Sequence, residues 1–309
     1  MKPQAAPLTV RTALREAFAQ LRATGVPSHT LAAELLLMHA LGRDRTWIYA
    51  HPEEEISASD AEKFFVMISR RANGEPTQHL TGKQEFWGLE FEITPDVLIP
   101  RPETEHLIEV ALDRLAVREL RAGGRQETDG AGLQIADIGT GSGCIAIALA
   151  RELPSAAFLA TDISSAALAV ACRNATRHNV ASRIHFLECN LLEGSFNSPP
   201  PILQSPLLFD LIVSNPPYVG RREAATLMRE VREHEPEIAL YGGEEGYEIY
   251  SDLVTQAAAH LKPSGILVLE LGHNSLAAVQ PLLDESTWTK VGVTNDLAGI
   301  PRVLAAEKL

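Results

Sequence analysis

A glycine-rich turn between a predicted strand and a predicted helix constrains the fold of this chain more than any other feature. Residues 133–138 are mostly apolar and predict a buried strand, and residues 144–150 predict the start of a helix. The turn at 139–143 reads Gly-Thr-Gly-Ser-Gly. This order is typical of parallel α/β sheets that bind a nucleotide-like ligand. The dinucleotide pattern Gly-x-Gly-x-x-Gly is broken, because Cys144 stands at its last position.

The next two predicted strands end in polar residues that could contact such a ligand. Asp162 follows the strand 157–161, where a carboxylate is placed to accept hydrogen bonds from both hydroxyls of a ribose. Asp162 could instead cap the helix that follows, and both roles could coexist. The strand 183–188 ends near Asn190 and Leu191. We expect the Asn190 amide on the amino group of an adenine and Leu191 on one face of the ring.

The sequence Asn215-Pro216-Pro217-Tyr218 follows another predicted buried strand, residues 209–214. Two successive prolines must end this strand, because neither has a backbone N–H and both fix φ. The turn leaves backbone carbonyls outside regular structure, next to the Asn215 amide and the Tyr218 ring. Such a pocket suits a planar NH2 group, with acceptors for both hydrogens and an aromatic face for the flat part of the substrate.

Amide and aromatic amine nitrogens are poor nucleophiles, because the lone pair is delocalised into the neighbouring π system. Two acceptors that hold the hydrogens favour a more pyramidal nitrogen and direct its lone pair towards an activated methyl group, without a strong general base. With the glycine turn upstream, the motif predicts a methyltransferase that acts on a planar nitrogen. A proline-rich turn without chemistry is the alternative, and it is the weaker one in this context.

These motifs belong to a longer pattern, and the chain closely resembles the PrmC/HemK-type glutamine N5-methyltransferases that modify peptide chain release factors. The resemblance covers nearly the whole chain. The Asn-Pro-Pro-Tyr motif is shared with adenine N6-methyltransferases, so the segment before the glycine turn is the more specific mark. The matching stretches are residues 84–88, 97–105 (Val-Leu-Ile-Pro-Arg-Pro-Glu-Thr-Glu), 139–143, 215–218, 235–236, 239–240, 242–246 and 296–299.

The resemblance implies S-adenosylmethionine as methyl donor and S-adenosylhomocysteine as product. The implied acceptor is the glutamine side-chain amide in the Gly-Gly-Gln loop of a release factor. The glycines of the turn are expected at the methionine end of the donor, Asp162 at the ribose and Leu191 at the adenine. The expected donor-binding residues are Gly139, Thr140, Gly141, Ser142, Gly143, Asp162, Asn190, Leu191 and Asn215.

The resemblance also assigns the residues that would hold the target amide. Asn215, Pro216 and Tyr218 are the expected catalytic residues, and with Pro217 they form the expected substrate-binding site. The chain departs from the family pattern at Asn190, where Asp is common. An amide still accepts through its oxygen, so donor binding would be altered rather than lost. Tyr241 is a second departure, because Asp is frequent before the Gly-Gly pair.

Length and composition favour an α/β enzyme with a smaller helical part. At 309 residues the chain is long enough for two domains. We expect an N-terminal helical domain at 1–75 that recognises the release factor, and a β-hairpin linker at 76–100. Residues 101–309 are expected to form a Rossmann-like S-adenosylmethionine-dependent methyltransferase domain. Its sheet would be mostly parallel and twisted, with helices on both faces.

The front segment shows helical periodicity and helix caps. Thr9 and Ser28 are the expected N-caps of two helices, and Ser59 with Glu62 predicts a capping box at the start of another. The expected core residues are Val10, Leu14, Phe18 and Leu21 in the first helix, Leu31, Leu35 and Met38 in the second, and Phe64, Phe65 and Ile68 in the third.

Charge bears on the substrate. The formal net charge is −13, and residues 1–75 hold nine Lys or Arg against nine Asp or Glu, so the later part carries the whole deficit. Such a surface repels a phosphate backbone unless it contains a basic patch. An exocyclic amine in nucleic acid, such as adenine N6, is therefore the second hypothesis. Arg221, Arg222, Arg229 and Arg232 could contact phosphate, although a solvated surface is the favoured interpretation.

The remaining composition indicates a reduced compartment. Three cysteines without Cys-x-x-Cys spacing predict packing residues, and ten histidines without clustering predict no metal. No apolar run of about 18 residues is present, so we expect no membrane span. The start lacks a signal-peptide core, which favours the cytoplasm. We expect a monomer. A third hypothesis is a donor-binding protein without transfer activity, and the intact Asn-Pro-Pro-Tyr motif speaks against it.

Overall fold

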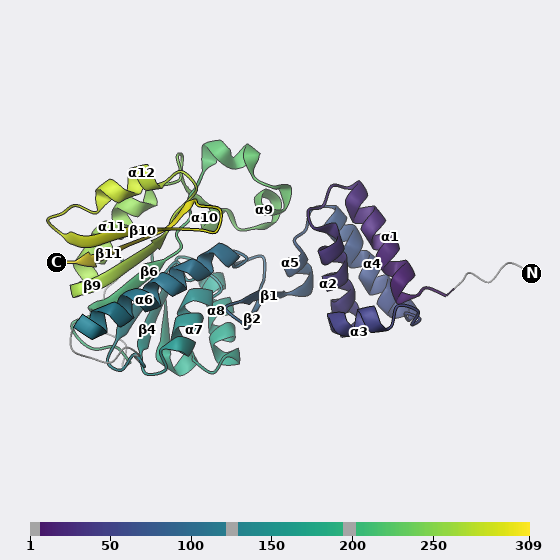
Figure 1. Cartoon of the computed structure of the whole chain (residues 1–309), viewed down its shortest axis with the longest axis horizontal. Helices are drawn as coiled ribbons and strands as arrows, with labels where there is room; N and C mark the ends of the chain where they lie inside the picture. Colours follow the sequence, from purple (N-terminus) through teal and green to yellow (C-terminus); the bar gives the residue numbers. More distant parts are fainter. Residues whose placement is uncertain (1–6, 122–128, 194–201) are drawn as a thin grey trace, which may run out of the picture. The chain divides into compact units, whose positions relative to one another are not determined.

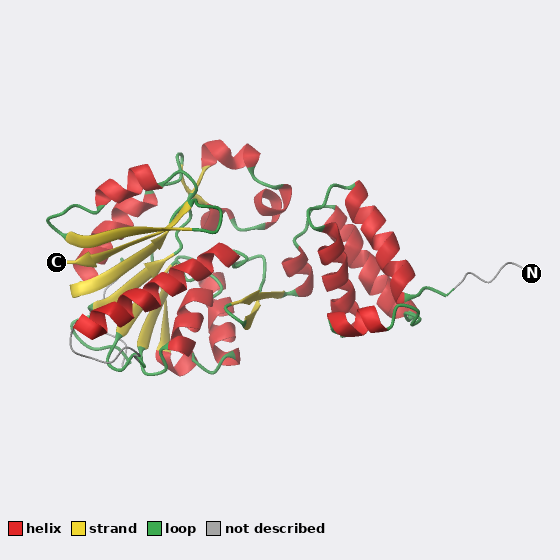
Figure 2. Cartoon of the chain, viewed as in Figure 1, coloured by secondary structure: helices red, strands yellow, loops and turns green. Residues whose placement is uncertain are grey.

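The computed structural model describes residues 7–121, 129–193 and 202–309, which fold into two units (Figures 1 and 2). The helical unit comprises Met1–Lys83 together with Met228–His234. The α/β unit comprises Gln84–Leu227 and Glu235–Leu309. The helical unit contains α1 (Val10–Ala23), α2 (His29–Leu41), α3 (Arg45–Ala50), α4 (Ala58–Ala72), α5 (Thr77–Thr81) and α9 (Arg229–His234).

The first helix begins as the sequence predicts. The Thr9 side chain accepts a hydrogen bond from the backbone N–H of Thr12, and the Thr12 side chain accepts from the backbone N–H of Thr9. This reciprocal pair satisfies two backbone donors at the helix start. The core of the helical unit includes Leu21 from α1, Leu37 from α2 and Phe64 from α4, all fully buried.

The prediction for the buried face of α2 is wrong. Leu31 is 45% exposed, whereas Ala33, Leu36 and Leu37 are buried. Apolar residues occur on every side of this helix, so the sequence periodicity does not indicate which face is buried. Packing against α1 and α4 decides which face that is. The Ser28 backbone is left-handed, and its side chain makes no capping hydrogen bond.

The N-cap of α4 lies two residues before its predicted place, and the predicted capping box of Ser59 and Glu62 is wrong. Ser57 is the N-cap, and its Oγ accepts a hydrogen bond from the Asp60 backbone N–H at 3.1 Å. Ser59 and Glu62 lie inside the helix instead. Several Ser and acidic residues in succession allow alternative pairings, and the chain direction before the helix selects one.

The predicted β-hairpin is present. It consists of β1 (Lys83–Phe86) and β2 (Leu89–Glu92), which form a two-stranded sheet. Phe86 and Phe91 are buried in a core cluster of the α/β unit. Their alternation with polar neighbours is the period expected for a strand with one buried face.

The α/β unit is built on a seven-stranded sheet with the strand order β10-β11-β9-β6-β3-β4-β5. Adjacent strands from β9 to β5 in this order pair in parallel, whereas β11 is antiparallel to both of its neighbours. The predicted mostly parallel sheet is confirmed. Its strands are β3 (Gln134–Ile138), β4 (Ala157–Asp162), β5 (Ile184–Glu188), β6 (Phe209–Ser214), β9 (Leu261–Glu270), β10 (Trp288–Asn295) and β11 (Pro301–Lys308).

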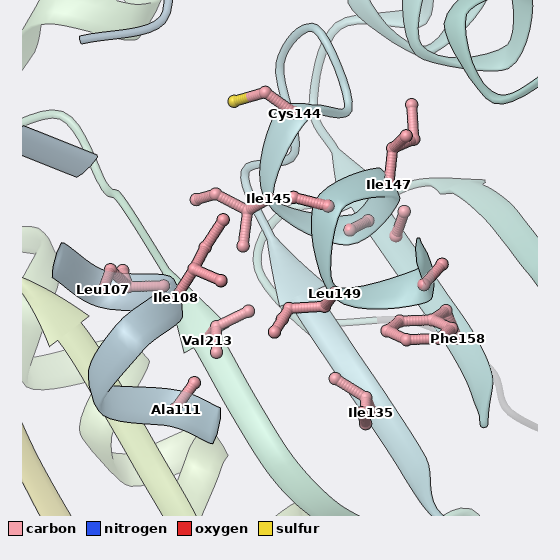
Figure 3. Packing of buried hydrophobic residues seen from close by; sticks show 14 of the residues in the cluster. Leu107, Ile108, Ala111, Ile135, Cys144, Ile145, Ile147, Leu149, Phe158 and Val213 are labelled. Atoms are coloured by element: carbon pink, nitrogen blue, oxygen red, sulfur yellow. The ribbon is translucent and has the colours of Figure 1, made fainter. Parts of the chain in front are cut away.

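Two apolar clusters confirm that helices cover both faces of the sheet. Alternate residues of β3 enter different clusters, Ile135 one and Ala136 the other. Figure 3 shows Leu149 of α7 between Ile135 and Val213 of the sheet, all three in one buried cluster. The helices of this unit are α6 (Glu105–Arg121), α7 (Cys144–Glu152), α8 (Ser165–Arg177), α10 (Glu237–Leu240), α11 (Ile249–His260) and α12 (Leu276–Val279), with 3-10 turns η1 (Pro102–Thr104), η2 (Ala181–Arg183), η3 (Arg221–Thr226) and η4 (Gln280–Leu282).

The strand register brings the predicted site residues to one edge of the sheet. Ile138, the last residue of β3, pairs with Thr161 on one side and Ser214 on the other. Ser214 in turn pairs with Leu269 of β9. The segments that follow these strands therefore emerge next to one another at the carboxyl edge, where open α/β sheets bind their ligands.

A short second sheet supports the turn after β6. Strand β7 (Val219–Gly220) pairs in parallel with β8 (Tyr241–Gly243). Gly242 lies so close to the turn that a Cβ placed on it would stand 2.2 Å from the Pro217 carbonyl oxygen. Only glycine, which has no side chain, fits at this position of β8.

Replacing Gly242 with Ala tests this close contact. We expect Gly242→Ala to lower the free energy of unfolding by about 1–3 kcal/mol, because the added methyl group must displace backbone atoms. The matched control is Gly292→Ala on β10, where the near neighbour is the flexible end of the Arg114 side chain. Urea denaturation of both variants measures the difference, and equal stability of the two would contradict the packing argument.

Candidate active site

A cavity of about 250 Å³ opens at the carboxyl edge of the sheet. Segments after β3, β4, β5 and β6 contribute to its walls, as does the segment around α10. Most of the residues predicted for the donor or the substrate meet here. Those that line the cavity are Gly139, Gly141, Asp162, Asn190, Leu191, Asn215, Pro216 and Pro217.

The glycine turn forms one wall of the cavity with its backbone. Gly139 and Gly141 have φ of 72° and 55°, and a Cβ on either residue would point into open space. Such φ values favour glycine over residues with a side chain. The Thr161 carbonyl oxygen accepts hydrogen bonds from the backbone N–H groups of Gly139 and Thr140, both at 2.9 Å. The end of β4 therefore holds the turn in place.

The other residues of the turn are not among those that line the cavity. Thr140 and Ser142 are buried, and the Thr140 hydroxyl donates to Asp137 Oδ2 at 2.7 Å. Burial raises the pKa of the Asp137 carboxyl to about 7. Gly143 lies against the side of Ala171. These positions shape the turn and are not among the lining residues, so their predicted contact with a donor stays a prediction.

Asp162 connects β4 to the glycine turn. Its Oδ2 accepts from the Gly141 backbone N–H at 2.9 Å, and its Oδ1 accepts from the Ser164 backbone N–H at 2.9 Å. Burial raises the pKa of this carboxyl. The N-cap of α8 is Ser164, whose side chain accepts from the Ala167 backbone N–H, so the alternative of Asp162 as the cap is wrong.

Asn190 and Leu191 form a tight turn after β5. The Leu191 carbonyl oxygen accepts a hydrogen bond from the Thr161 hydroxyl at 2.8 Å. The Asn190 Nδ2 donates to Glu193 Oε2 at 3.2 Å. The Asn190 amide is thus oriented by its own loop, and both Asn190 and Leu191 line the cavity.

In the side-chain amide of Asn215, the nitrogen has a hydrogen-bond partner and the oxygen has none among the described residues. Its Nδ2 donates to Thr104 Oγ1 at 3.1 Å. Its Oδ1 is buried and has no hydrogen-bond partner among the described residues. A buried acceptor without a partner is rare, and a ligand that supplies a donor would explain it. Asn215 lines the cavity together with Pro216, which is buried.

Tyr218 lies behind this wall and is not among the lining residues. Its hydroxyl donates to Glu270 Oε1 at 3.3 Å. The ring packs so closely on Gly272 that a Cβ there would stand 3.1 Å from ring atoms. Burial and the Glu270 carboxylate raise the pKa of the phenol, so it remains a hydrogen-bond donor.

Sequence reasoning missed much of the opposite wall. Asp96, Val97 and Leu98 line the cavity, as do Ile238, Ala239 and Tyr241. Both segments overlap stretches that carry the family resemblance, and this overlap was the signal that could have found them.

A buried carboxylate joins these two segments. The Glu235 side chain accepts from the Arg101 guanidinium at 2.5 Å and from the Ile99 backbone N–H at 3.2 Å. Glu235 is 6% exposed. A buried carboxylate needs such partners, and removing one of them is costly. Arg101 also belongs to the Pro-Arg-Pro segment that leads into η1.

The cavity fits a nucleoside-containing sulfonium donor. Two glycines leave open space beside the backbone, the acidic residue Asp162 lines the same cavity, and so do apolar residues such as Leu191 and Ile249. Among the described residues, no group of three or more His, Cys, Asp or Glu could hold a metal ion. Within the same ranges, no helix is long and apolar enough to cross a bilayer.

Comparisons with known proteins agree with the family resemblance seen in the sequence. A family model described as the PrmC N-terminal domain matches residues 12–82, and one described as the methyltransferase small domain matches residues 125–237. A release factor glutamine methyltransferase of Koribacter versatilis is 42% identical over 97% of this chain and 99% of its own length. One of Nitratidesulfovibrio vulgaris is 39% identical over 97% of this chain and 95% of its own.

Solved structures share the fold. The N-terminal domain of human METTL16, crystallised in complex with SAH, has a TM-score of 0.50 and 18% identity, covering 82% of this chain and 85% of that one. At that identity the likeness shows the fold alone. The relatives above extend over both units at a much higher identity. The chain belongs to the release factor glutamine methyltransferase family.

Proposed function

We propose that this chain transfers a methyl group from S-adenosylmethionine to the side-chain amide nitrogen of the glutamine in the Gly-Gly-Gln loop of a release factor. The observation that carries the proposal is the buried Asn215 Oδ1, which has no hydrogen-bond partner among the described residues and belongs to a lining residue of the cavity. The family supports both the donor and the class of acceptor.

Asn215 and Pro216 hold the target amide in this proposal. Asn215 Oδ1 accepts one hydrogen of the NH2 group, and the Pro216 carbonyl oxygen accepts the other. This grip favours a pyramidal nitrogen whose lone pair points away from the acceptors. S-adenosylmethionine supplies an electrophilic methyl group. The methyl carbon bonds to the nitrogen as its bond to sulfur breaks, which leaves S-adenosylhomocysteine. The nitrogen then releases a proton to water, so no strong base is needed beside Asn215.

The remaining lining residues bind the donor. Gly139 and Gly141 let its methionine end approach the backbone, and the Asp162 carboxylate accepts from the ribose hydroxyls. Asn190 and Leu191 contact the adenine. Thr140, Ser142 and Gly143 stabilise the turn from behind, and Tyr218 supports Asn215 rather than the substrate itself.

The charged residues that could have favoured nucleic acid are already paired. Arg222 forms an ion pair with Glu245, and Arg221 lies 3.6 Å from Glu237. Arg229 and Arg232 both pair with Glu233. Pairing removes much of the attraction for phosphate, which supports a protein substrate. We further propose that the helical unit recognises the release factor, and that the protein acts as a monomer in the cytoplasm.

Acceptor identity is tested by offering labelled S-adenosylmethionine with release factor, DNA or ribosomal RNA. We expect label in the release factor alone, and on the glutamine of the Gly-Gly-Gln loop when the peptide is sequenced by mass spectrometry. Replacing that glutamine in the release factor is the control and should abolish labelling. Label in nucleic acid with unlabelled release factor would overturn the proposal.

Asn215→Ala tests the grip on the target amide. We expect turnover to fall by roughly 10²-fold or more, because one positioned acceptor is lost, while donor affinity stays nearly unchanged. The matched control is Asn295→Ala, since Asn295 is exposed at the end of β10. Steady-state kinetics and calorimetry measure both effects, and an unchanged turnover number would contradict the role of Asn215.

Asp162→Ala tests the ribose contact. We expect donor affinity to weaken by about 1–3 kcal/mol, because charge-assisted hydrogen bonds are lost. Asp252→Ala is the control, since Asp252 is exposed on α11. Calorimetry with S-adenosylhomocysteine gives the comparison, and equal affinity of Asp162→Ala and the control would show that Asp162 does not contact the donor.

A further inference from the structure

A buried carboxylate lies directly behind the Asn-Pro-Pro-Tyr turn. Glu270 is the last residue of β9 and is 0% exposed. The pairing of Ser214 with Leu269 places Glu270 beside the point where the chain leaves β6. Its Oε1 accepts from the Tyr218 hydroxyl at 3.3 Å, and its backbone carbonyl accepts from the Tyr250 hydroxyl at 2.7 Å.

Thr104 connects Glu270 to Asn215. It is the last residue of η1, is 2% exposed, and its Oγ1 accepts from Asn215 Nδ2 at 3.1 Å. Glu270 Oε2 has no hydrogen bond of standard geometry among the described residues, yet the Thr104 hydroxyl stands close enough to lower the pKa of the carboxyl. The hydrogen of the Thr104 hydroxyl has no other acceptor among the described residues, so we infer that it is donated to this carboxylate.

The direction of these bonds follows from the number of hydrogens. A hydroxyl has one hydrogen, and a carboxylate can only accept. Once Thr104 donates to Glu270, its oxygen can only accept from Asn215. The Asn215 amide must then place its NH2 group on Thr104, which turns Oδ1 away from it. Without this constraint the amide could rotate by half a turn and present an NH2 group to the NH2 group of the substrate.

We propose that Glu270 is a positioning residue for methyl transfer, which acts through the Thr104 hydroxyl to hold Asn215 Oδ1 towards the target nitrogen. This inference rests on the function proposed above and extends it to residues that do not touch the substrate. Tyr218 belongs to the same network, because its hydroxyl occupies the other oxygen of Glu270. The orientation of Asn215 Oδ1 thus depends on the charge of the Glu270 carboxylate.

The network gives turnover a dependence on pH. Burial raises the pKa of Glu270 to about 7, opposed by the Thr104 hydroxyl, Arg302 and Tyr218. The ionised form holds Asn215 correctly, and protonation gives Glu270 a hydrogen that Thr104 Oγ1 can accept. Turnover should therefore be high above this pKa and fall as the pH drops through it. The titratable and polar groups that face Glu270 are Glu103 and Thr104 of η1, Cys144 of α7, Tyr218, Tyr250 of α11 and Arg302 of β11.

Thr104→Val and Thr104→Ser test the relay. Valine keeps the shape without the hydroxyl, so we expect kcat to fall roughly 10- to 100-fold while donor affinity changes less than about twofold. Serine restores the hydroxyl and should keep kcat within about threefold of wild type. Thr255→Val is the control, because that exposed hydroxyl donates only to the Ser251 carbonyl of its own helix. A Thr104→Val variant with wild-type kcat would overturn the proposal.

Glu270→Gln tests the charge. The glutamine side chain can donate a hydrogen bond where the carboxylate could only accept one, so kcat should fall. Glutamine does not titrate, so the decline of kcat below about pH 7 should disappear from the pH profile of kcat. Asp137 titrates in the same range and remains in this variant, which separates the two groups. The acid decline persisting unchanged in Glu270→Gln would contradict the role of Glu270. If this variant does not fold, the two Thr104 variants decide.

An NMR measurement separates the relay from the proposed function. The Asn215 side-chain amide, assigned by its loss in Asn215→Ala, should exchange slowly with water in the wild type and faster in Thr104→Val. Identical shifts and exchange rates in both proteins would overturn the relay, whatever the enzyme methylates. A wild type that labels no release factor would overturn the proposed function, and the amide exchange would still decide the relay.

Discussion

Parallel pairing of β3, β4, β6 and β9 in register is the constraint on which the site depends. Each strand ends within a residue of its neighbour, so the glycine turn, Asp162 and Asn215 leave the sheet at one edge. Apolar clusters on both faces keep the strands in this register, because a slip of one residue would move buried side chains to the opposite layer. The cavity follows from this arrangement rather than from any single motif.

Buried polar groups then fix the details of the cavity. The Thr161 backbone and hydroxyl hold both the glycine turn and Leu191, so one strand end supports two walls. Asp162 closes the turn through the Gly141 N–H, and Glu235 joins the segment before η1 to the segment before α10. Such groups must be paired when they are buried, which makes their orientation unique. Asn215 Oδ1 lacks such a partner among the described residues, and Asn215 lines the cavity.

Local patterns predicted the strands and the ends of several helices, because alternation and capping act over a few residues. Strand β3, the glycine turn that follows it and the β1–β2 hairpin lie where the sequence predicts them. The pattern failed in α2, where an almost wholly apolar helix offers several equivalent faces, and Leu31 is exposed. It gave no means to distinguish the turn residues that line the cavity from Thr140 and Ser142, which are buried.

The sequence by itself determined the family and the order of strands and helices, and it predicted the chemistry of the Asn-Pro-Pro-Tyr turn, since these depend on residue type and local spacing. Tertiary structure alone decided which side chains touch the cavity and which support them. Thr104 and Glu270 lie far from Asn215 along the chain, and only the pairing of β6 with β9 and the position of η1 bring them together. Contacts between distant segments depend on the packing of the whole unit, which no local pattern encodes.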